Sequence, residues 1–342
     1  MLFLVEILRV LDKKPIPLGN ERNNKISKIP LPFTDMIGTD TSSHPYKEWT
    51  TDELAAPDTT NARVDGADAG SMTNVLGQRV GNHHQISDKV VKVSFRADAS
   101  NTIGRAKELS YQLSRRQQEL RRDVEAIMLL NQASVADDGN ATPGKSAGLP
   151  AWVKTNVQLS GAQAVGGFQT GTGLVSAFTR AAAAVGLTET KVRTAAQQVY
   201  QNGGEASVFM TTPDVVTAFS SYLFTSSARV ATLMSDVEGS AAKATAMGSV
   251  NVFVTDFGTL KFVPNRLQPK FTIAAVTNAA DVFILDPSYL SISYLQGYRT
   301  EELAKTGSAN NRQILVDWTL CVGNEKAQAM LNDINPATAV VA

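Results

Sequence analysis

Residues 101–132 read NTIGRAKELSYQLSRRQQELRRDVEAIMLLNQ, and this stretch decides the fold class. Apolar side chains recur there at three- and four-residue spacing, at Leu109, Leu113, Leu120, Val124, Ile127 and Met128. The charged residues fall mainly on the other faces, at Arg115, Arg116, Glu119, Arg122 and Glu125. About thirty helical residues measure roughly 45 Å. The segment therefore predicts a long spine helix within a mixed domain.

Strand patterns lie on both sides of this helix. Before it, residues 89–95 alternate, with Val91, Val93 and Phe95 on one side, which predicts a strand in a hairpin that reaches out from the body. After it, the patterns predict helices at 173–201, broken near Gly186, and from Pro213 to about Tyr222. The remaining segments predict strands at 207–210, 249–262, 271–285, 290–295, 298–303 and 313–322, and a short helix or strand at 325–331. The fold class is α+β, without an internal repeat.

The N-terminal part of the chain has a different character. Residues 12–75 are polar and interrupted by six prolines, so they predict an extended arm and loop with few core residues. The first 11 residues are apolar but short, and Glu6 interrupts them. They fail as a signal peptide and as a membrane span, and no other stretch is predicted to cross a bilayer.

Composition narrows the classes of function. The chain has 342 residues with 32 basic and 32 acidic side chains. A neutral chain lacks the basic excess of a dedicated nucleic-acid-binding protein, so its main partners are expected to be other proteins. Cys321 is the only cysteine, which excludes an intrachain disulfide and a cysteine-based zinc site. We expect Cys321 to be buried in a strand.

One segment matches a phosphate-binding pattern. Residues 139–146, GNATPGKS, fit G-x-x-x-x-G-K-[ST]. A functional site of this kind needs a strand before the loop and a helix after it, so that backbone N–H groups surround the phosphate. Here a helix precedes the loop, and Pro150 follows closely. The match is interpreted as a coincidence in a loop rich in glycine, serine and threonine.

No other motif predicts catalysis or metal binding. His83 and His84 point to opposite faces of a strand, so a single metal is not expected to bind both. His44 is the only other histidine, and no G-x-S-x-G elbow is present. Asp137 and Asp138 are best explained as loop-capping or solvated acids. We therefore expect no catalytic residue, no cofactor and no metal site, and a protein that is not an enzyme.

Four stretches resemble the major capsid (major head) proteins of tailed bacteriophages, specifically those of SU-ten-like podoviruses. They are residues 48–57 (EWTTDELAAP), 119–126 (ELRRDVEA), 256–266 (DFGTLKFVPNR), and 302–307 (ELAKTG) followed by 312–316 (RQILV). Their order is the family's, and the resemblance covers roughly residues 45–330. Each stretch alone is weak evidence for the family, but the four stretches in this order are specific to it.

The resemblance implies a Hong Kong 97-type capsid fold with an N-terminal arm, an extended loop, a peripheral domain with a long spine helix, and an axial domain. The implied boundaries are 1–46 for the arm, 47–96 for the extended loop and its strands, 97–150 for the peripheral domain with the spine helix, 151–289 for the axial domain, 290–326 for return strands of the peripheral domain, and 327–342 for the C-terminal segment. The extended loop is then expected to lie across a neighbouring subunit. The expected contact residues are Arg63, Val64, Val75, Leu76, Arg79 and Val80.

The implied function is self-assembly into pentamers and hexamers that form an icosahedral head around packaged phage DNA, in the virion and assembled in the host cytoplasm. Implied partners are a scaffolding protein, a portal, a decoration protein and non-specifically held DNA, with no membrane. Two features depart from the family's type member. No lysine lies between Glu48 and Asp88, so covalent cross-linking from the loop is not expected, and only about 45 residues precede the motif at Glu48, so a separate scaffold is expected. The alternatives are an encapsulin-like compartment shell and a nucleotide-hydrolysing enzyme built on residues 139–146.

Overall fold

The computed structural model describes residues 30–66, 68, 77–100, 107–161, 163–225, 251–305 and 307–337, without the side chains of 221–225. The predictions for residues 1–29 and for Val75 and Leu76 fall outside this range. The described chain forms two compact units. The first comprises Asp88–Arg121 and Arg299–Leu315, and the second comprises Leu31–Ser87, Arg122–Tyr298 and the chain from Val316 onward.

The spine helix is α3, Glu108–Met128. It confirms the helix predicted within 101–132, of which residues 101–106 lie outside the described part of the chain. Leu120, Val124 and Met128 on its apolar face are at most 1% exposed. A short helix, α2 (Phe95–Ala99), precedes it and is capped by the Ser94 side chain, which accepts a hydrogen bond from the N–H of Ala97.

A four-stranded sheet has the order β1, β13, β14, β4. Its strands are β1 (Gly38–Thr41), β13 (Leu290–Glu302), β14 (Ala309–Val322) and β4 (Gln85–Ser94). Val91 and Val93 are buried on β4 as predicted. Phe95 is not on that face, because the chain turns into α2 there and leaves 41% of its surface exposed. The two strands predicted at 290–295 and 298–303 are one continuous strand, β13.

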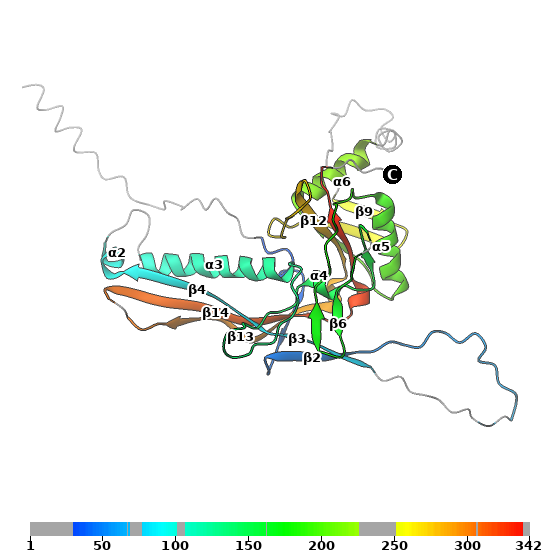
Figure 1. Cartoon of the computed structure of the whole chain (residues 1–342), viewed down its shortest axis with the longest axis horizontal. Coiled ribbons are helices and arrows are strands. Elements are labelled where there is room, and N and C mark those ends of the chain that lie inside the picture. The colour runs from blue at the N-terminus through cyan, green and yellow to red at the C-terminus, as the bar shows by residue number, and fades with distance from the viewer. Residues whose placement is uncertain are drawn as a thin grey trace, which may run out of the picture. The chain divides into compact units, whose positions relative to one another are not determined.

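The second unit contains a seven-stranded sheet, shown with α5 and α6 in Figure 1. Its order is β5 (Val157–Gln158), β15 (Ala329–Ile334), β12 (Val276–Leu285), β8 (Val208–Thr211), β10 (Gly258–Pro264) and β9 (Val252–Thr255), with β11 (Phe271–Ile273) paired to β12. The strand predicted at 207–210 is confirmed as β8. The segments predicted as strands at 249–262 and 271–285 each contain two strands, β9 with β10 and β11 with β12.

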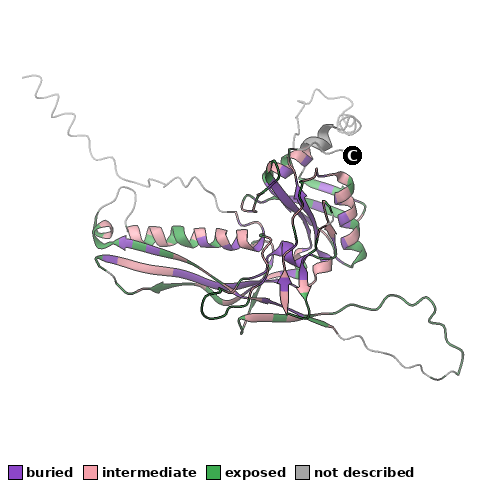
Figure 2. Cartoon of the chain, viewed as in Figure 1, coloured by how far each residue is buried: buried purple, intermediate pink, exposed green. Residues whose placement is uncertain are grey.

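Two helices pack on this sheet and complete a hydrophobic core, drawn purple in Figure 2. They are α5 (Glu189–Gln201) and α6 (Pro213–Thr225). Phe209 of β8 lies 5.7 Å from Phe219 of α6 and 4.7 Å from Phe262 of β10, between ring centroids. Among the described helices, none is both long and apolar enough to cross a bilayer.

The helix predicted over 173–201 is correct only in its second half. Thr188 caps α5 by accepting a hydrogen bond from the N–H of Lys191, so the helix begins at Glu189, three residues after Gly186. The first half instead holds β7 (Leu174–Ser176), which pairs with β6 (Gly167–Gln169). The small polar residues between these strands favour turns over a continued helix.

Part of the predicted arm belongs to a core. Leu31 and Ile37 are 7% exposed, and Phe33 is fully buried, so the expectation that residues 12–75 contribute few core residues was wrong for 31–37. The next residues form β1, which pairs in parallel with β13. The C-terminal segment predicted at 327–342 likewise contributes β15 to the interior of the seven-stranded sheet.

Candidate functional site: the extended loop and its anchors

The extended loop starts and ends in a two-stranded hairpin. Strands β2 (Tyr46–Thr51) and β3 (Gln78–His83) are antiparallel, with Tyr46 opposite His83 and Thr51 opposite Gln78. The loop is therefore the chain between Thr51 and Gln78. It lies within the range 47–96 that the resemblance implies for the extended loop and its strands.

Hydrogen bonds fix this hairpin to the rest of the second unit. The Tyr46 hydroxyl donates to the carbonyl of Gly173 at 2.8 Å, and Nε1 of Trp49 donates to the carbonyl of Val322 at 3.1 Å. The Trp49 ring also lies 5.3 Å from that of Trp152. Gly81 allows the close approach of the strands, since a Cβ there would lie 2.6 Å from Cζ of Tyr46.

A buried polar network holds the end of the hairpin. The Asn82 side chain is wholly buried, donates to the carbonyl of Leu320 at 2.8 Å, and accepts from the N–H of Ala147 at 2.9 Å. Oγ of Ser146 accepts from the N–H of Leu320 at 3.1 Å and lies 3.2 Å from Nδ2 of Asn82. These contacts satisfy polar groups that are expensive to leave unpaired.

The phosphate-binding pattern at 139–146 takes part in this network. Its serine, Ser146, is buried and structural, while Lys145 is exposed and its backbone bridges to Val135. No strand enters the described loop in the way the phosphate site requires. Asp138 closes the turn by accepting from the N–H groups of Asn140, Ala141 and Thr142, which lowers its pKa to about 2. The prediction that these acids cap a loop is confirmed.

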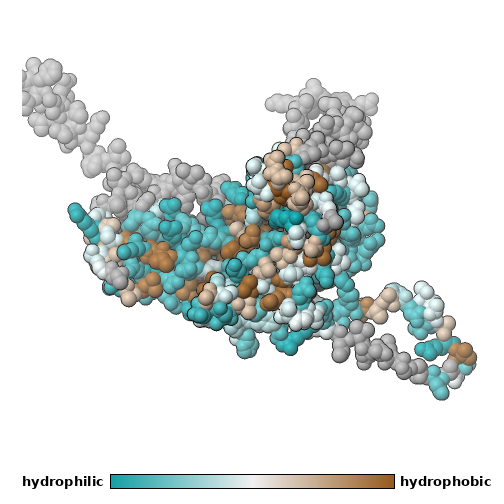
Figure 3. Space-filling view, in the orientation of Figure 1, coloured by the Kyte–Doolittle hydropathy of each residue, from teal (hydrophilic) through white to brown (hydrophobic). Residues whose placement is uncertain are grey.

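The loop itself is solvent-exposed. Residues 52–66 are all exposed, and Leu54 and Val64 expose 100% and 80% of their surface. Figure 3 shows hydrophilic and hydrophobic atoms interspersed along it. Near its start, Glu53 forms an ion pair with Lys326 of the same chain.

The predicted contact residues therefore differ in their surroundings. Arg63 and Val64 lie on the exposed loop and are free to meet a neighbour. Val80 is only 7% exposed, because β3 packs it within its own chain, and Arg79 forms an ion pair with Glu48 of the facing strand. Val80 thus has little surface left for another subunit.

Glu125 holds the segment that precedes β1, a role the sequence analysis missed by placing it on a polar helix face. It is fully buried. Oε1 accepts from the N–H of Phe33 and from Nδ2 of Asn265, both at 2.8 Å, and Oε2 accepts from the N–H of Thr34 at 2.8 Å. The sequence signal was available, since Glu125 falls next to Val124 and three residues before Met128, both of which are buried.

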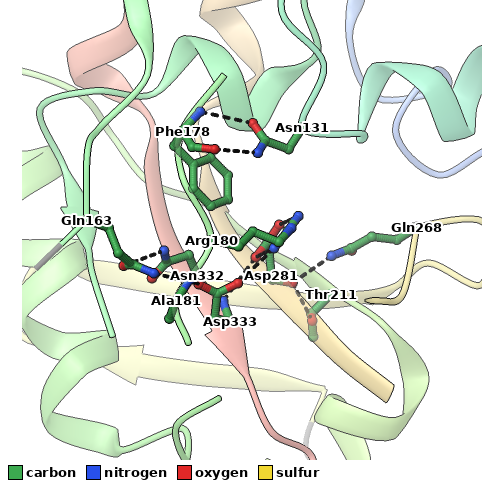
Figure 4. Close-up of polar contacts among 10 residues, drawn as sticks. All are labelled: Asn131, Gln163, Phe178, Arg180, Ala181, Thr211, Gln268, Asp281, Asn332 and Asp333. Carbon is green, nitrogen blue, oxygen red and sulfur yellow. Dashed lines mark hydrogen bonds and ion pairs between the residues drawn. The ribbon is translucent and has the colours of Figure 1, made fainter. Parts of the chain in front are cut away.

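A second missed group is the buried cluster around Arg180 (Figure 4). Its guanidinium bonds to both carboxylate oxygens of Asp281 on β12, at 3.2 and 3.1 Å, and to Asp333 on β15 at 2.8 Å. The ring of Phe271 lies 3.2 Å from Cζ of Arg180. Asp333 also accepts from the N–H of Ala181 at 2.8 Å. Burial raises the pKa of Asp281, and the adjacent guanidinium opposes that effect.

The histidines do not form a metal site among the described residues, where no group of three or more His, Cys, Asp or Glu side chains is arranged to bind one. Nδ1 of His84 lies 3.2 Å from Oδ1 of Asp317 in the interior. The His83 ring lies 4.6 Å from that of Tyr46, between ring centroids, and burial lowers the pKa of His83, with the His84 charge as a smaller cause. Cys321 is buried on β14 as predicted, and burial raises its pKa to about 12.

Comparison with known proteins gives a consistent result. The model of the family described as SU10 major capsid protein matches residues 23–335. The major capsid protein of Escherichia phage Phieco32 is 38% identical over 110 residues, which are 32% of this chain and 31% of that protein. The match therefore spans about a third of the relative's length.

Solved structures show a similar fold at low sequence identity. The capsid of cyanophage A-1(L) has a TM-score of 0.56 at 11% identity, covering 92% of this chain and 95% of that one. The SrpI encapsulin of Synechococcus elongatus PCC 7942 has a TM-score of 0.54 at 11% identity, covering 98% of each chain. These likenesses show the fold alone, which is the predicted Hong Kong 97-type α+β fold.

Proposed function

Because this chain belongs to the SU10 major capsid protein family, we propose that it is the structural subunit of a tailed-phage head. Copies of it assemble into pentamers and hexamers that close an icosahedral shell around packaged DNA. The observation that carries the proposal is the family match, which extends over nearly the whole chain. The exposed loop on a fixed hairpin supports it, since loops held by a rigid scaffold commonly carry binding functions.

Domain roles are part of this proposal. The first unit, with the N-terminal part of α3, corresponds to the peripheral domain, and the seven-stranded sheet with α5 and α6 corresponds to the axial domain. The residues from 327 onward were expected to form a separate C-terminal segment. In this assignment β15 belongs instead to the axial domain, because it pairs with β12 in the seven-stranded sheet.

The partners follow from the role. A separate scaffolding protein directs assembly in the host cytoplasm, a portal occupies one vertex, and a decoration protein binds the outer surface. The neutral chain favours weak, non-specific contact with DNA. No enzymatic activity is proposed, and this is supported by the structural use of Ser146 in the only phosphate-binding pattern noted in the sequence.

Electron microscopy of the purified protein tests the proposal. Expression with the scaffold is expected to give closed particles with pentameric and hexameric capsomers. A protein that remains monomeric under all assembly conditions would contradict it.

The encapsulin-like alternative has one specific observation in its favour, the similarity to the SrpI shell. The contents of particles from phage-infected cells separate the two functions. Packaged DNA supports the phage head, and an enclosed cargo protein without DNA supports the compartment.

A further inference from the structure

Three places in the chain carry an aspartate or asparagine followed by glycine. They are Asp65–Gly66, Asp138–Gly139 and Asn202–Gly203. At such a pair the main-chain nitrogen of the glycine can attack the side-chain carbonyl carbon of the residue before it, because glycine has no side chain to hinder the approach. The three pairs are therefore the chemical candidates for a spontaneous rearrangement of the main chain.

The three glycines do not differ in backbone conformation or in the space around them. Gly66, Gly139 and Gly203 have φ values of 79°, 68° and 81°. A Cβ added at any of them would meet no atom within 4 Å beyond its neighbours in the chain. Steric access is thus similar at the three pairs, and the hydrogen bonds of the two reacting groups distinguish them.

The Asp138–Gly139 pair is restrained on both sides of the bond that would form. Oδ1 of Asp138 accepts hydrogen bonds from the N–H groups of residues 140–142, at 2.8 to 2.9 Å. These bonds stabilise the ionised carboxylate and lower its pKa to about 2, so very little of the protonated acid, which is the form that loses water, is present. The attacking N–H of Gly139 is itself bonded to Oδ1 of Asp137 at 2.9 Å.

The Asn202–Gly203 pair is restrained in a similar way at the C-terminal end of α5. Nδ2 of Asn202 donates to Oδ1 of Asn156 at 2.8 Å and to the carbonyl of Gln198 at 3.0 Å. The N–H of Gly203 donates to the carbonyl of Tyr200 at 3.1 Å. Both reacting groups must leave these partners before they can meet.

The Asp65–Gly66 pair has no such restraint. Both residues are exposed, on the extended loop between β2 and β3. Neither the Asp65 carboxylate nor the N–H of Gly66 forms a hydrogen bond or ion pair with another described residue. The carboxyl group is therefore free to rotate toward the glycine nitrogen.

We propose that Asp65 isomerises spontaneously in the folded protein, whereas the fold protects Asp138 and Asn202. The nitrogen of Gly66 attacks Cγ of the protonated Asp65 carboxyl group and forms a C–N bond that closes a succinimide ring. The hydroxyl group leaves with the amide proton as a water molecule. Water then adds to the former main-chain carbonyl carbon of Asp65 and breaks its bond to the Gly66 nitrogen. The product is isoaspartate, water is the only co-reactant, and the mass of the protein is unchanged.

Isomerisation alters the loop without altering its net charge. The main chain then runs through Cβ and Cγ of residue 65 and is one carbon longer, and the free carboxylate is attached directly to Cα. This group is the substrate of isoaspartate-specific carboxyl methyltransferases, so the loop of an aged subunit becomes a methyl acceptor. The inference does not depend on the function proposed above, because the reaction takes place within a single chain.

Incubation of the purified, unassembled subunit in heavy-oxygen water at neutral pH tests the proposal. Each passage through the succinimide introduces a heavy oxygen atom, which peptide mapping by mass spectrometry locates. Label is expected at Asp65 at least about tenfold faster than at Asp138, because reaction at Asp138 first requires hydrogen bonds to a charged group to break. In urea the rates at Asp138 and Asn202 are expected to rise at least about tenfold, and the rate at Asp65 to stay within about threefold of its native value.

Two variants and a second assay serve as controls. Asp65→Glu would have to form a six-membered ring, which closes much more slowly, so label at this position is expected to disappear. Asp137→Ala frees the N–H of Gly139 and is expected to raise labelling at Asp138 by about threefold or more. Methyl transfer from labelled S-adenosylmethionine by an isoaspartate-specific methyltransferase is expected on the aged wild-type loop peptide and not on that of Asp65→Glu.

The wild-type comparison needs no variant, so it decides the matter even if Asp137→Ala fails to fold. Equal labelling of Asp65 and Asp138 in the folded subunit would overturn the proposal. So would a rise at Asp65 in urea as large as the rise at Asp138, because the folded loop would then protect Asp65 as well.

Discussion

Oε1 of Glu125 accepts a 2.8 Å hydrogen bond from the backbone N–H of Phe33, although the two residues are 92 positions apart. The same carboxylate binds the N–H of Thr34 and the amide of Asn265. One buried acid on α3 therefore connects the segment before β1 to the turn after β10. A carboxylate suits this task because it offers up to four acceptor sites and donates none.

The first prediction is that Glu125→Ala destabilises the subunit by roughly 3–5 kcal/mol, because it leaves buried N–H groups without an acceptor. Urea denaturation of the unassembled subunit measures this. Glu119→Ala is the matched control on the same helix. Its exposed pairs with Arg115 and Arg116 are worth less than about 1 kcal/mol. Equal losses in the two variants would refute the anchoring role.

The second prediction concerns the Arg180 cluster. Arg180→Met leaves two buried carboxylates without their cation, and we expect a loss of about 3–5 kcal/mol. Adding Asp281→Asn and Asp333→Asn is expected to recover part of it, since neutral amides cost less to bury than unpaired charges.

Arg193→Met provides the control for this experiment, because Arg193 pairs with Glu189 and Asp256 at the surface. Its expected loss is below about 1 kcal/mol. A triple variant less stable than Arg180→Met alone would show that the amides disrupt the cluster further and that charge was not the cause.

The sequence predicted the elements whose signal is local. Apolar spacing identified α3, alternation identified most strands, and Pro213 marked the start of α6. Local sequence patterns did not predict the structure of segments whose place is decided by contacts with residues far away in the chain. The segment 31–37 looks like a polar arm until Glu125 is known to bind its backbone, and β15 has no local feature that places it beside β12.

The contact candidates show the same limit. Strand pairing between β3 and β2 buries Val80 within its own chain and places Arg79 beside Glu48. The exposure of Val64 could be predicted without knowing which strands pair, because turn-forming residues follow it. Which strands pair with each other across about 30 positions of the chain, as β2 and β3 do, does not follow from local patterns in one sequence.

The third prediction separates two adjacent residues of the phosphate-binding pattern. Lys145→Ala is expected to change stability by less than about 0.5 kcal/mol, as exposed substitutions usually do. Ser146→Ala removes the acceptor for the N–H of Leu320 and is expected to cost about 1–3 kcal/mol. Thermal melting measures both. Loss of ATP binding in Lys145→Ala would instead revive the nucleotide-hydrolysing alternative.

The fourth prediction concerns the loop. Replacing residues 55–76 with a short Gly/Ser turn retains Glu53 and β3, so we expect a folded subunit, because loop-closure entropy changes only slowly with length. The same variant is expected not to form closed shells. Circular dichroism reports the fold and electron microscopy the assembly. Normal particles would mean that the loop is dispensable, and an unfolded protein would mean that it belongs to a core.

The last prediction is a pH dependence that originates at His83. Burial lowers the pKa of this imidazole below its ordinary value of 6.5. The unfolded chain therefore binds a proton more readily than the folded one, so this residue makes stability fall as the pH drops below about 6.5. The effect is expected in the urea midpoint measured between about pH 7.5 and 5.5.

His83→Gln keeps a polar side chain beside Tyr46 but cannot titrate, so the midpoint should depend less steeply on pH. An unchanged slope in His83→Gln would show that another group titrates and that the base of the extended loop is not sensitive to acid.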